Sequence, residues 1–504
     1  RERLNTTRKY LLSMWHALPK NRHDRVERRA LRHLGHRYFM RRFGISVRGL
    51  EPPPVGHQPS LGIAEILSQQ VPGYVEAVLE SQHAAIHGFS LDDAMYMVVM
   101  LEQLISDSQI VLLEHVYADL NLQTSALLDE NFLRDVIELY VVHWIIGDRI
   151  HNKSYSSTAF HGDFHRPDVR NVFLPGWAEI HWMIEGEVLS LDFVRQQGSA
   201  IGHTKEMWRP WRYTFEDAHV IVGSITNSFG SFINGWCQDF KDSLIALDTH
   251  ALGRVPLAKF YGQTVYKDYE VVQRFTMSES ELKEIGALDS SSKLFGKQVI
   301  IPNYIQSPVN CYINTAHYAV CCRNECENIL DEIEEKLPSA AAPDEVMAVV
   351  QNLTFQASLD DDGAAPVGEK LKALLQHIAV ENGGVIHLHS RLFAQWLHYA
   401  FPRECAFPYQ ARKVPQTSLR QVQRREDDLL DAAALDALEN ASKEELDWMS
   451  QWDWQEEYFL MNLPEPGMEL ADIWSCVSAL GRCVIFVILL GAVYVSTIHS
   501  ENCG

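Results

Sequence analysis

The sequence predicts a mainly α-helical protein with a multi-helix N-terminal domain, repeated helix–loop–helix modules and a C-terminal transmembrane helix. Apolar residues recur at spacings of three and four along much of residues 1–235, which is the periodicity of amphipathic helices. Loops that contain an acidic residue and a Gly follow apolar helices in residues 236–400. From Ile473 to Ile498 the chain is almost entirely apolar and carries Arg482 as its single charge.

Composition and hydrophobic pattern divide the 504 residues into five expected segments. They are a helical domain with a basic N-terminal helix at 1–235, a pair of helix–loop–helix modules at 236–310, a helical region containing Cys and His at 311–410, an acidic linker or helix at 411–470, and a transmembrane segment with a short tail at 471–504. We expect helices at 62–70, 73–82, 91–107, 135–146 and 215–232, and a linker at 340–368. The first residue is Arg1 rather than Met, so we expect a fragment or a processed form.

The charge is unevenly distributed and argues against a nucleic-acid partner. The net charge is −22, yet residues 1–50 hold 14 Lys and Arg against 3 Asp and Glu, while the remainder holds 30 against 63. So acidic a body would repel phosphates. The basic N-terminal segment could face acidic lipid or the acidic remainder of the chain. We favour the second, because Leu31, Leu34 and Phe39 give this helix a core-facing side.

A loop that follows residue 240 has the spacing of a calcium-binding loop. An amphipathic helix with Phe240 and Leu244 leads into Asp248, Gly253 and Val255, which would be loop positions 1, 6 and 8. The segment resembles an EF-hand, and the resemblance implies a helix–loop–helix fold. The alternative is an ordinary helix–turn–helix with a Gly at its turn.

Most of the calcium ligands of such a loop are missing. Position 3 is His250, position 5 is Leu252 and position 12 is Lys259, where an EF-hand has oxygen ligands. Because Ca²⁺ takes six to eight oxygens, we expect binding no tighter than roughly millimolar, or none.

Two weaker copies of the pattern follow. Asp289 precedes Val299 by ten residues, three more than in the first loop. Paired EF-hands join their loops by a short antiparallel contact at position 8, so the resemblance implies that Val255 and Val299 meet. Farther on, Gly384 and Ile386 repeat the Gly-x-Val spacing of the first loop. Residues 236–310 therefore resemble a degenerate EF-hand pair.

Three stretches resemble a second group of proteins. Residues 298–310, 317–330 and 387–408 are similar to a family of uncharacterised membrane proteins from unicellular algae, and the similarity extends over residues 25–410. This resemblance implies membership of a family, and it supplies no mechanism.

None of the nine cysteines precedes Cys237, and six of them cluster. The six are Cys237, Cys311, Cys321, Cys322, Cys326 and Cys405. They could form three disulfides, which would imply an oxidising compartment, or remain reduced core residues. N-x-S/T sites occur at Asn5, Asn152, Asn352 and Asn440. Together these features favour a lumenal or extracellular soluble region.

The C-terminal apolar segment is the expected membrane anchor. Residues 483–498 are free of charge but number 16, fewer than the about 20 that span a bilayer, so Arg482 would extend toward an interface. Trp474 and Tyr494 lie near the ends, where aromatic rings are favoured. We expect a single-pass protein whose lipid contacts run from Ile473 to Ile498. A buried C-terminal core helix is the alternative.

The loop that begins at His161 holds the sharpest polar cluster. His161, Asp163 and His165 resemble the His-Gly-Asp-x-His start of the catalytic loop in aminoglycoside and choline kinases. The resemblance implies that Asp163 handles a hydroxyl proton and that Asp192 corresponds to a downstream metal-binding residue. Asp168 stands where that family has a metal-binding Asn, and a Gly-rich phosphate loop is missing. A divalent metal site and a polar surface loop are the other interpretations.

A second group of metal-ligand types lies between residues 387 and 405. His387, His389, His398 and Cys405 are suitable for zinc, and His387 and His389 would share one face of an extended segment. Their spacing matches no zinc signature, and Cys405 is also a candidate for a disulfide. Packed or hydrogen-bonded histidines, with no cofactor, are the alternative.

Two functions from different classes fit these patterns. The first is a membrane-anchored scaffold or protein-interaction protein with calcium-independent EF-hand-like modules and an unknown protein partner. The second is a metal-dependent enzyme that uses the loop from His161 to Asp168 or the cluster from His387 to Cys405. The sequence has no Walker, Rossmann or Gly-x-Ser-x-Gly motif, which favours the first.

Overall fold

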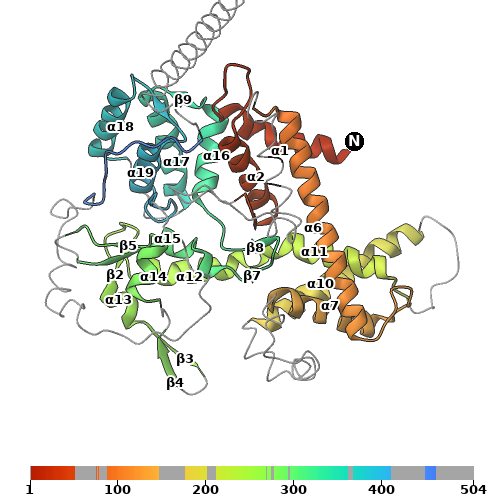
Figure 1. Cartoon of the computed structure of the whole chain (residues 1–504). Helices are drawn as coiled ribbons and strands as arrows, with labels where there is room; N and C mark the ends of the chain where they lie inside the picture. The colour runs from red at the N-terminus through yellow and green to blue at the C-terminus, as the bar shows by residue number, and fades with distance from the viewer. Residues whose placement is uncertain are drawn as a thin grey trace, which may run out of the picture. The chain divides into compact units, whose positions relative to one another are not determined.

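The structure is a computed structural model that describes residues 2–50, 75, 78, 88–146, 176–200, 212–267, 270–273, 277–292, 296–360, 367–409 and 449–460. The chain divides into two units, Arg1–Leu460 and Met461–Gly504, and the described residues all belong to the first. These residues are mainly helical, which confirms the mainly α-helical part of the predicted fold class (Figure 1). The helices expected at 62–70 and 73–82 lie largely outside the described ranges.

The N-terminal part is built from helices that share one apolar core. They are α1 (Glu2–Ala17), α2 (Arg28–Phe43), α6 (Leu91–Asp119), α7 (Glu130–Ile146), α10 (Trp177–Ala200) and α11 (Phe215–Phe232). Each contributes buried side chains to that core, for example Leu11, Leu34, Leu101, Ile137, Ile184 and Ile225. The helix expected at 91–107 continues to Asp119, because Leu113, Val116 and Tyr117 extend its buried face.

Among the described residues, α6 is the one helix that is long and apolar enough to cross a membrane by length and composition. Its most apolar window has a mean hydropathy of 1.3, and 39% of that window is buried inside the protein. Core helices of soluble proteins have the same composition. This helix is internal, whereas the predicted transmembrane segment from Ile473 to Ile498 lies outside the described residues.

A small antiparallel sheet joins the N-terminal helices to residues near 320. Strand β1 (Ile45–Val47) pairs with β8 (Tyr318–Val320), which also pairs with β7 (Ile313–Asn314). Ile45 lies opposite Val320, so segments 275 positions apart in the chain share this sheet. The first and third expected segments are therefore in direct contact.

Residues 234–305 form two helix–loop–helix units, which we call the first pair. The units comprise α12 (Asn234–Ile245), β2 (Arg254–Pro256) and α13 (Leu257–Gly262), then α14 (Glu279–Glu284), β5 (Leu288–Asp289), β6 (Gln298–Ile300) and α15 (Ile301–Ile305), with the hairpin of β3 (Thr264–Lys267) and β4 (Glu270–Gln273) between them. Strands β2 and β6 are antiparallel, and Val255 lies opposite Val299. A core that includes Leu244, Phe260 and Ile285 fills the pair.

Residues 326–400 form two more such units, the second pair. They comprise α16 (Cys326–Lys336), β9 (Ala340–Ala341) and α17 (Pro343–Asp360), then α18 (Glu369–Glu381), β10 (Ile386–His387) and α19 (Arg391–Ala400). Ile386 lies opposite Ala341 in an antiparallel contact between β10 and β9. The prediction of a linker at 340–368 is wrong for α17, because Pro343 can start a helix and Val346 and Val350 are buried one turn apart.

The short 3₁₀ turn Pro308–Asn310 connects the first pair to β7.

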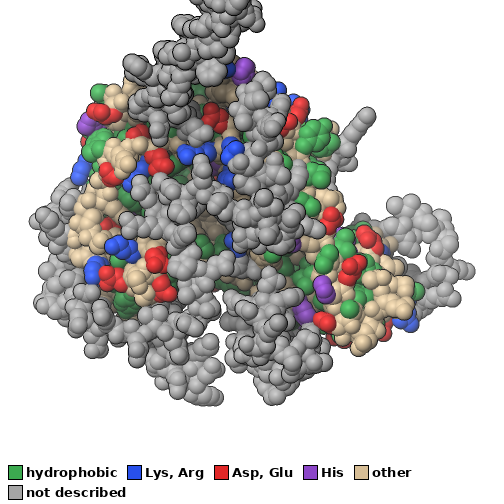
Figure 2. All heavy atoms as spheres, viewed as in Figure 1, with side chains coloured by type: hydrophobic (Ala, Val, Ile, Leu, Met, Phe, Trp, Pro, Cys, Tyr) green, Lys and Arg blue, Asp and Glu red, His purple; other side chains and the backbone are tan. Residues whose placement is uncertain are grey.

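On the face shown in Figure 2, Lys and Arg side chains of the described residues are interspersed with Asp and Glu side chains. Oppositely charged side chains also form ion pairs between helices.

The most deeply buried of these ion pairs belongs to Arg37 on α2. Its side chain is 2% exposed, and its guanidinium contacts Glu327 and Glu334 at 2.5 Å each and also Asp331. All three carboxylates come from α16. Burial alone would lower the pKa of Arg37, but the three carboxylates outweigh burial and raise it. The basic N-terminal helix is thus paired with an acidic helix of the same chain.

Replacing Arg37 by Leu should destabilise the protein by about 3–5 kcal/mol, because buried carboxylates would lose their counter-charge. Urea unfolding of both proteins measures the change. The matched control is Arg41→Leu, since Arg41 contacts the same Asp331 at 3.1 Å but is 44% exposed. That loss should stay below about 1 kcal/mol. Equal losses for the two variants would contradict the assignment.

Candidate functional site

The first loop of the first pair is organised around Asp248. Its carboxylate accepts hydrogen bonds from the backbone N–H groups of Leu252 at 3.0 Å and of Gly253 at 2.9 Å. The guanidinium Nε of Arg403 also donates to this carboxylate, at 3.2 Å. The Asp248 side chain is 1% exposed. A buried carboxylate with these partners is fully supplied with donors and with one positive charge.

Gly253 allows the segment that follows α19 to approach this loop. Its φ is +67°, a conformation that residues with a Cβ rarely adopt, and a Cβ at this position would lie 1.8 Å from the carbonyl oxygen of Pro402. Arg403, the next residue, is thereby held over Asp248. The close approach of this segment explains both the need for Gly and the position of the guanidinium.

The second loop has the same arrangement with different residues. Asp289 accepts from the guanidinium Nε of Arg254 at 2.9 Å, and both side chains are 3% exposed. The other oxygen of Asp289 accepts from the backbone N–H and the hydroxyl of Ser291, at 2.9 and 2.6 Å. Arg254 belongs to the first loop, where it also donates to the carbonyl oxygen of Leu252 at 3.2 Å, so its bond to Asp289 links the two loops.

Each loop of the first pair therefore offers one acidic side chain, and a guanidinium is already bound to it. Leu252, at the fifth position of the first loop, is 4% exposed and belongs to the protein interior rather than to a ligand shell. Ca²⁺ requires six to eight oxygens, several of them carboxylates. The arrangement can hold the loops in shape through arginine.

The structure places the six clustered cysteines within bonding distance of one another in pairs. It joins Cys237 to Cys322, Cys311 to Cys321, and Cys326 to Cys405. The pairs cross-link α12 to the segment after β8, the two flanks of the β7–β8 hairpin, and α16 to the segment after α19.

The four residues from His387 to Cys405 that were considered for zinc do not share a site. Cys405 is bonded to Cys326, so its sulfur is not free to bind a metal as a thiolate. The His387 ring packs edge-on against Tyr458, with 5.0 Å between ring centroids, and burial lowers the pKa of His387. His389 instead lies beside Glu334, whose carboxylate is 2.7 Å from its Nε2.

His398 is the most buried member of this group. It is 0% exposed, and its Nδ1 donates to the carbonyl oxygen of Cys405 at 2.7 Å. Burial, followed by the nearby charge of Arg254, lowers the pKa of His398 well below its usual value. A neutral imidazole bonded to backbone is a packing element of the core.

The polar loop with His161, Asp163 and His165 lies outside the described residues. Asp192, the downstream residue that the kinase resemblance implied, lies on α10 and accepts a hydrogen bond from the Tyr213 hydroxyl at 2.7 Å. Asp192 therefore has a partner within the helical core of the N-terminal part.

Sequence reasoning missed the two arginines that neutralise the loops. Arg254 has a local signal, since it directly follows Gly253 at the seventh loop position. Arg403 has none, because 155 residues separate it from Asp248. His33, which lies near His389, also went unnoticed, because it belongs to a helix whose pattern indicated packing alone.

Gly253→Ala should lower the stability by about 2–4 kcal/mol, since the added Cβ meets backbone and the φ is strained. The matched control is Gly383→Ala. Gly383 has a similar φ of +71°, but a Cβ there would have no neighbour within 4 Å. That substitution should cost about 1–2 kcal/mol, from the backbone alone. Thermal and urea unfolding compare the two, and equal losses would argue against the Pro402 contact.

No family model, no curated protein and no solved structure matches the chain.

Proposed function

We propose that the protein is a membrane-anchored scaffold whose EF-hand-like modules bind peptide segments without calcium. The observation that carries this proposal is the guanidinium at the acidic residue of each loop of the first pair, Arg403 on Asp248 and Arg254 on Asp289. A bound cation closes the loops of an EF-hand, and here covalently attached cations take that place. Modules of this kind hold one conformation and do not respond to calcium.

The pairing of loops supports the EF-hand-like assignment. In both pairs, short antiparallel strands join the two loops, with Val255 opposite Val299 in one and Ile386 opposite Ala341 in the other. In both pairs these residues are flanked by helices whose apolar sides form the core. The repetition of one arrangement supports a duplicated module.

The second pair already holds an extended segment of its own chain, residues 449–460. Gln395 on α19 exchanges two hydrogen bonds with the backbone of Asp453, at 2.9 and 3.0 Å. At the start of α19 the backbone N–H of Arg391 donates to the carbonyl oxygen of Glu457 at 2.8 Å, and the backbone N–H of Phe459 donates to the carbonyl oxygen of His389 at 3.0 Å. Such main-chain contacts are a common way to bind an extended peptide.

The cysteines and the C-terminal segment support a cellular compartment and a membrane anchor for the proposed scaffold. Three disulfides favour an oxidising compartment, so we place the soluble part in a lumen or outside the cell. The apolar segment from Ile473 to Ile498 would anchor it as a single transmembrane helix. The partner is a protein rather than a nucleic acid, in keeping with a net charge of −22.

Calcium should leave the purified chain unchanged. We expect no saturable heat when Ca²⁺ is titrated to about 1 mM, because each loop carboxylate is already paired and other oxygen ligands are missing. The melting temperature should be the same in Ca²⁺ and in a chelator. Arg403→Gln should lower stability equally in both conditions, which separates loss of the guanidinium from a calcium effect.

Micromolar calcium binding, or a calcium-dependent rise in melting temperature, would refute the calcium-independent module. A protein that co-purifies with the full chain should stay bound in the chelator. Release of that protein by the chelator would contradict the proposal even if no calcium heat were measured.

Removal of residues 471–504 should release the chain from membranes. The full chain is expected to remain with the membrane fraction after alkaline carbonate extraction, because a transmembrane helix resists it, whereas the shortened chain should be extracted. A matched control removes Asn502–Gly504 only, through a stop codon at Asn502. Extraction of the full chain by carbonate would rule out the anchor.

A further inference from the structure

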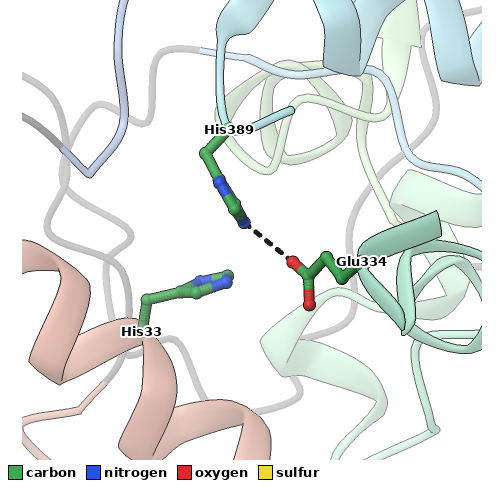
Figure 3. Close-up of side chains that lie close together, drawn as sticks. All are labelled: His33, Glu334 and His389. Atoms are coloured by element: carbon green, nitrogen blue, oxygen red, sulfur yellow. Dashed lines mark hydrogen bonds and ion pairs between the residues drawn. The ribbon is translucent and has the colours of Figure 1, made fainter. Parts of the chain in front are cut away.

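Three side chains of metal-ligand type converge between the N-terminal helices and the second pair. His33 lies on α2, Glu334 on α16, and His389 between β10 and α19, and one ligand atom from each lies within 4.8 Å of the others. Figure 3 shows the two imidazole rings and the carboxylate turned toward a common point. The three residues come from segments far apart in the sequence, so no sequence motif marks them.

The geometry is that of a set of ligands around a small central space. The Nε2 atom of His389 lies 2.7 Å from a carboxylate oxygen of Glu334, and the rings of His33 and His389 are 5.6 Å apart at an angle of 76°. Glu334 is 3% exposed and His389 is 8% exposed. Burial of two imidazoles and a carboxylate together needs a compensating partner.

Two nitrogen atoms of the cluster have no hydrogen-bond partner among the described residues. They are Nε2 of His33 and Nδ1 of His389, and both atoms are buried. Buried polar atoms in proteins are nearly always bonded, so an unpartnered ring nitrogen beside a carboxylate points to a group that accepts its lone pair. A metal ion is such a group, and it would take the Nε2 lone pair of His33.

Arg37 orients the carboxylate of Glu334 toward the cluster. It binds one carboxylate oxygen, Oε2, at 2.5 Å, and leaves the other, Oε1, directed at His389. The positive charge of Arg37 beside Oε2 stabilises the carboxylate form of Glu334. An outer partner that orients a ligating carboxylate is typical of protein metal sites.

The charge around the cluster admits a divalent cation. Arg37 is surrounded by Glu327, Asp331 and Glu334, so the carboxylates outnumber its single positive charge. Imidazole binds metals in its neutral form, through a ring nitrogen that carries no proton, and the buried Nε2 atom of His33 has no hydrogen-bond partner among the described residues.

We propose that His33, Glu334 and His389 bind one zinc ion in a three-ligand site whose fourth position is taken by water. Two imidazoles and one carboxylate favour zinc over calcium or magnesium, which prefer oxygen ligands. Tetrahedral zinc places its ligand atoms roughly 3.3 Å apart. Nε2 of His389 and Oε1 of Glu334, which lie 2.7 Å apart, would therefore separate slightly to admit the ion. The ion would fasten α2 to the second pair, independently of the calcium-free loops proposed above.

The test is a zinc titration of the full chain after treatment with a chelator. We expect a single equivalent of Zn²⁺ to bind and to raise the melting temperature, because it binds the folded form. Co²⁺ in place of Zn²⁺ should give the visible absorption of a four-coordinate site. His33→Gln and His389→Gln should each weaken zinc binding by more than the ~10–100-fold that loss of an outer partner costs.

The matched control is His387→Gln, two residues before His389, where the ring packs against Tyr458 and takes no part in the cluster. This variant should bind zinc as the wild type does. Circular dichroism identifies variants that remain folded, and the wild-type titration decides the question if a variant does not fold. A wild-type chain that takes up no zinc overturns the proposal. Undiminished zinc binding by folded His33→Gln also overturns it, as does a loss of zinc affinity in His387→Gln that equals the loss in His389→Gln.

Discussion

A guanidinium as deeply buried as that of Arg37 is stable only where carboxylates surround it, and its three carboxylates all come from α16. Arg37 and Glu334 are separated by 297 residues, so this requirement fixes α2 against α16 of the second pair. The β1–β8 contact joins the same two parts of the chain, because β1 continues from α2 and β8 precedes α16. Arg37 of the basic N-terminal segment is thus a counter-charge for carboxylates of the same chain.

In the loops of the first pair, buried carboxylates are likewise paired with arginine. Asp248 and Asp289 are buried acids, and each is neutralised by a guanidinium instead of a free ion. The two sources differ in their consequences. Arg254 comes from the neighbouring loop and ties the pair together, whereas Arg403 arrives with the segment after α19 and ties the second pair to the first.

Local sequence patterns predicted many of the helices and the first loop. They could not predict contacts between residues far apart in the sequence. The apolar spacing around Leu244 predicted a helix and Gly253 a turn, and the EF-hand resemblance implied the contact of Val255 with Val299 that the structure contains. The helix α17 was missed because alanine, proline and aspartate at its start resemble a linker in composition. The partner of Asp248 could not be predicted, since a contact across 155 residues leaves no periodic signal in one sequence.

The three disulfides divide this region into covalent rings. Cys237–Cys322 closes a ring around the first pair, with the small Cys311–Cys321 ring inside it, and Cys326–Cys405 closes a second ring around the second pair. The two large rings follow one another along the chain and do not interlace. A protease that cuts once inside either ring therefore leaves both fragments attached, and they separate on a gel only after a reductant has opened that ring.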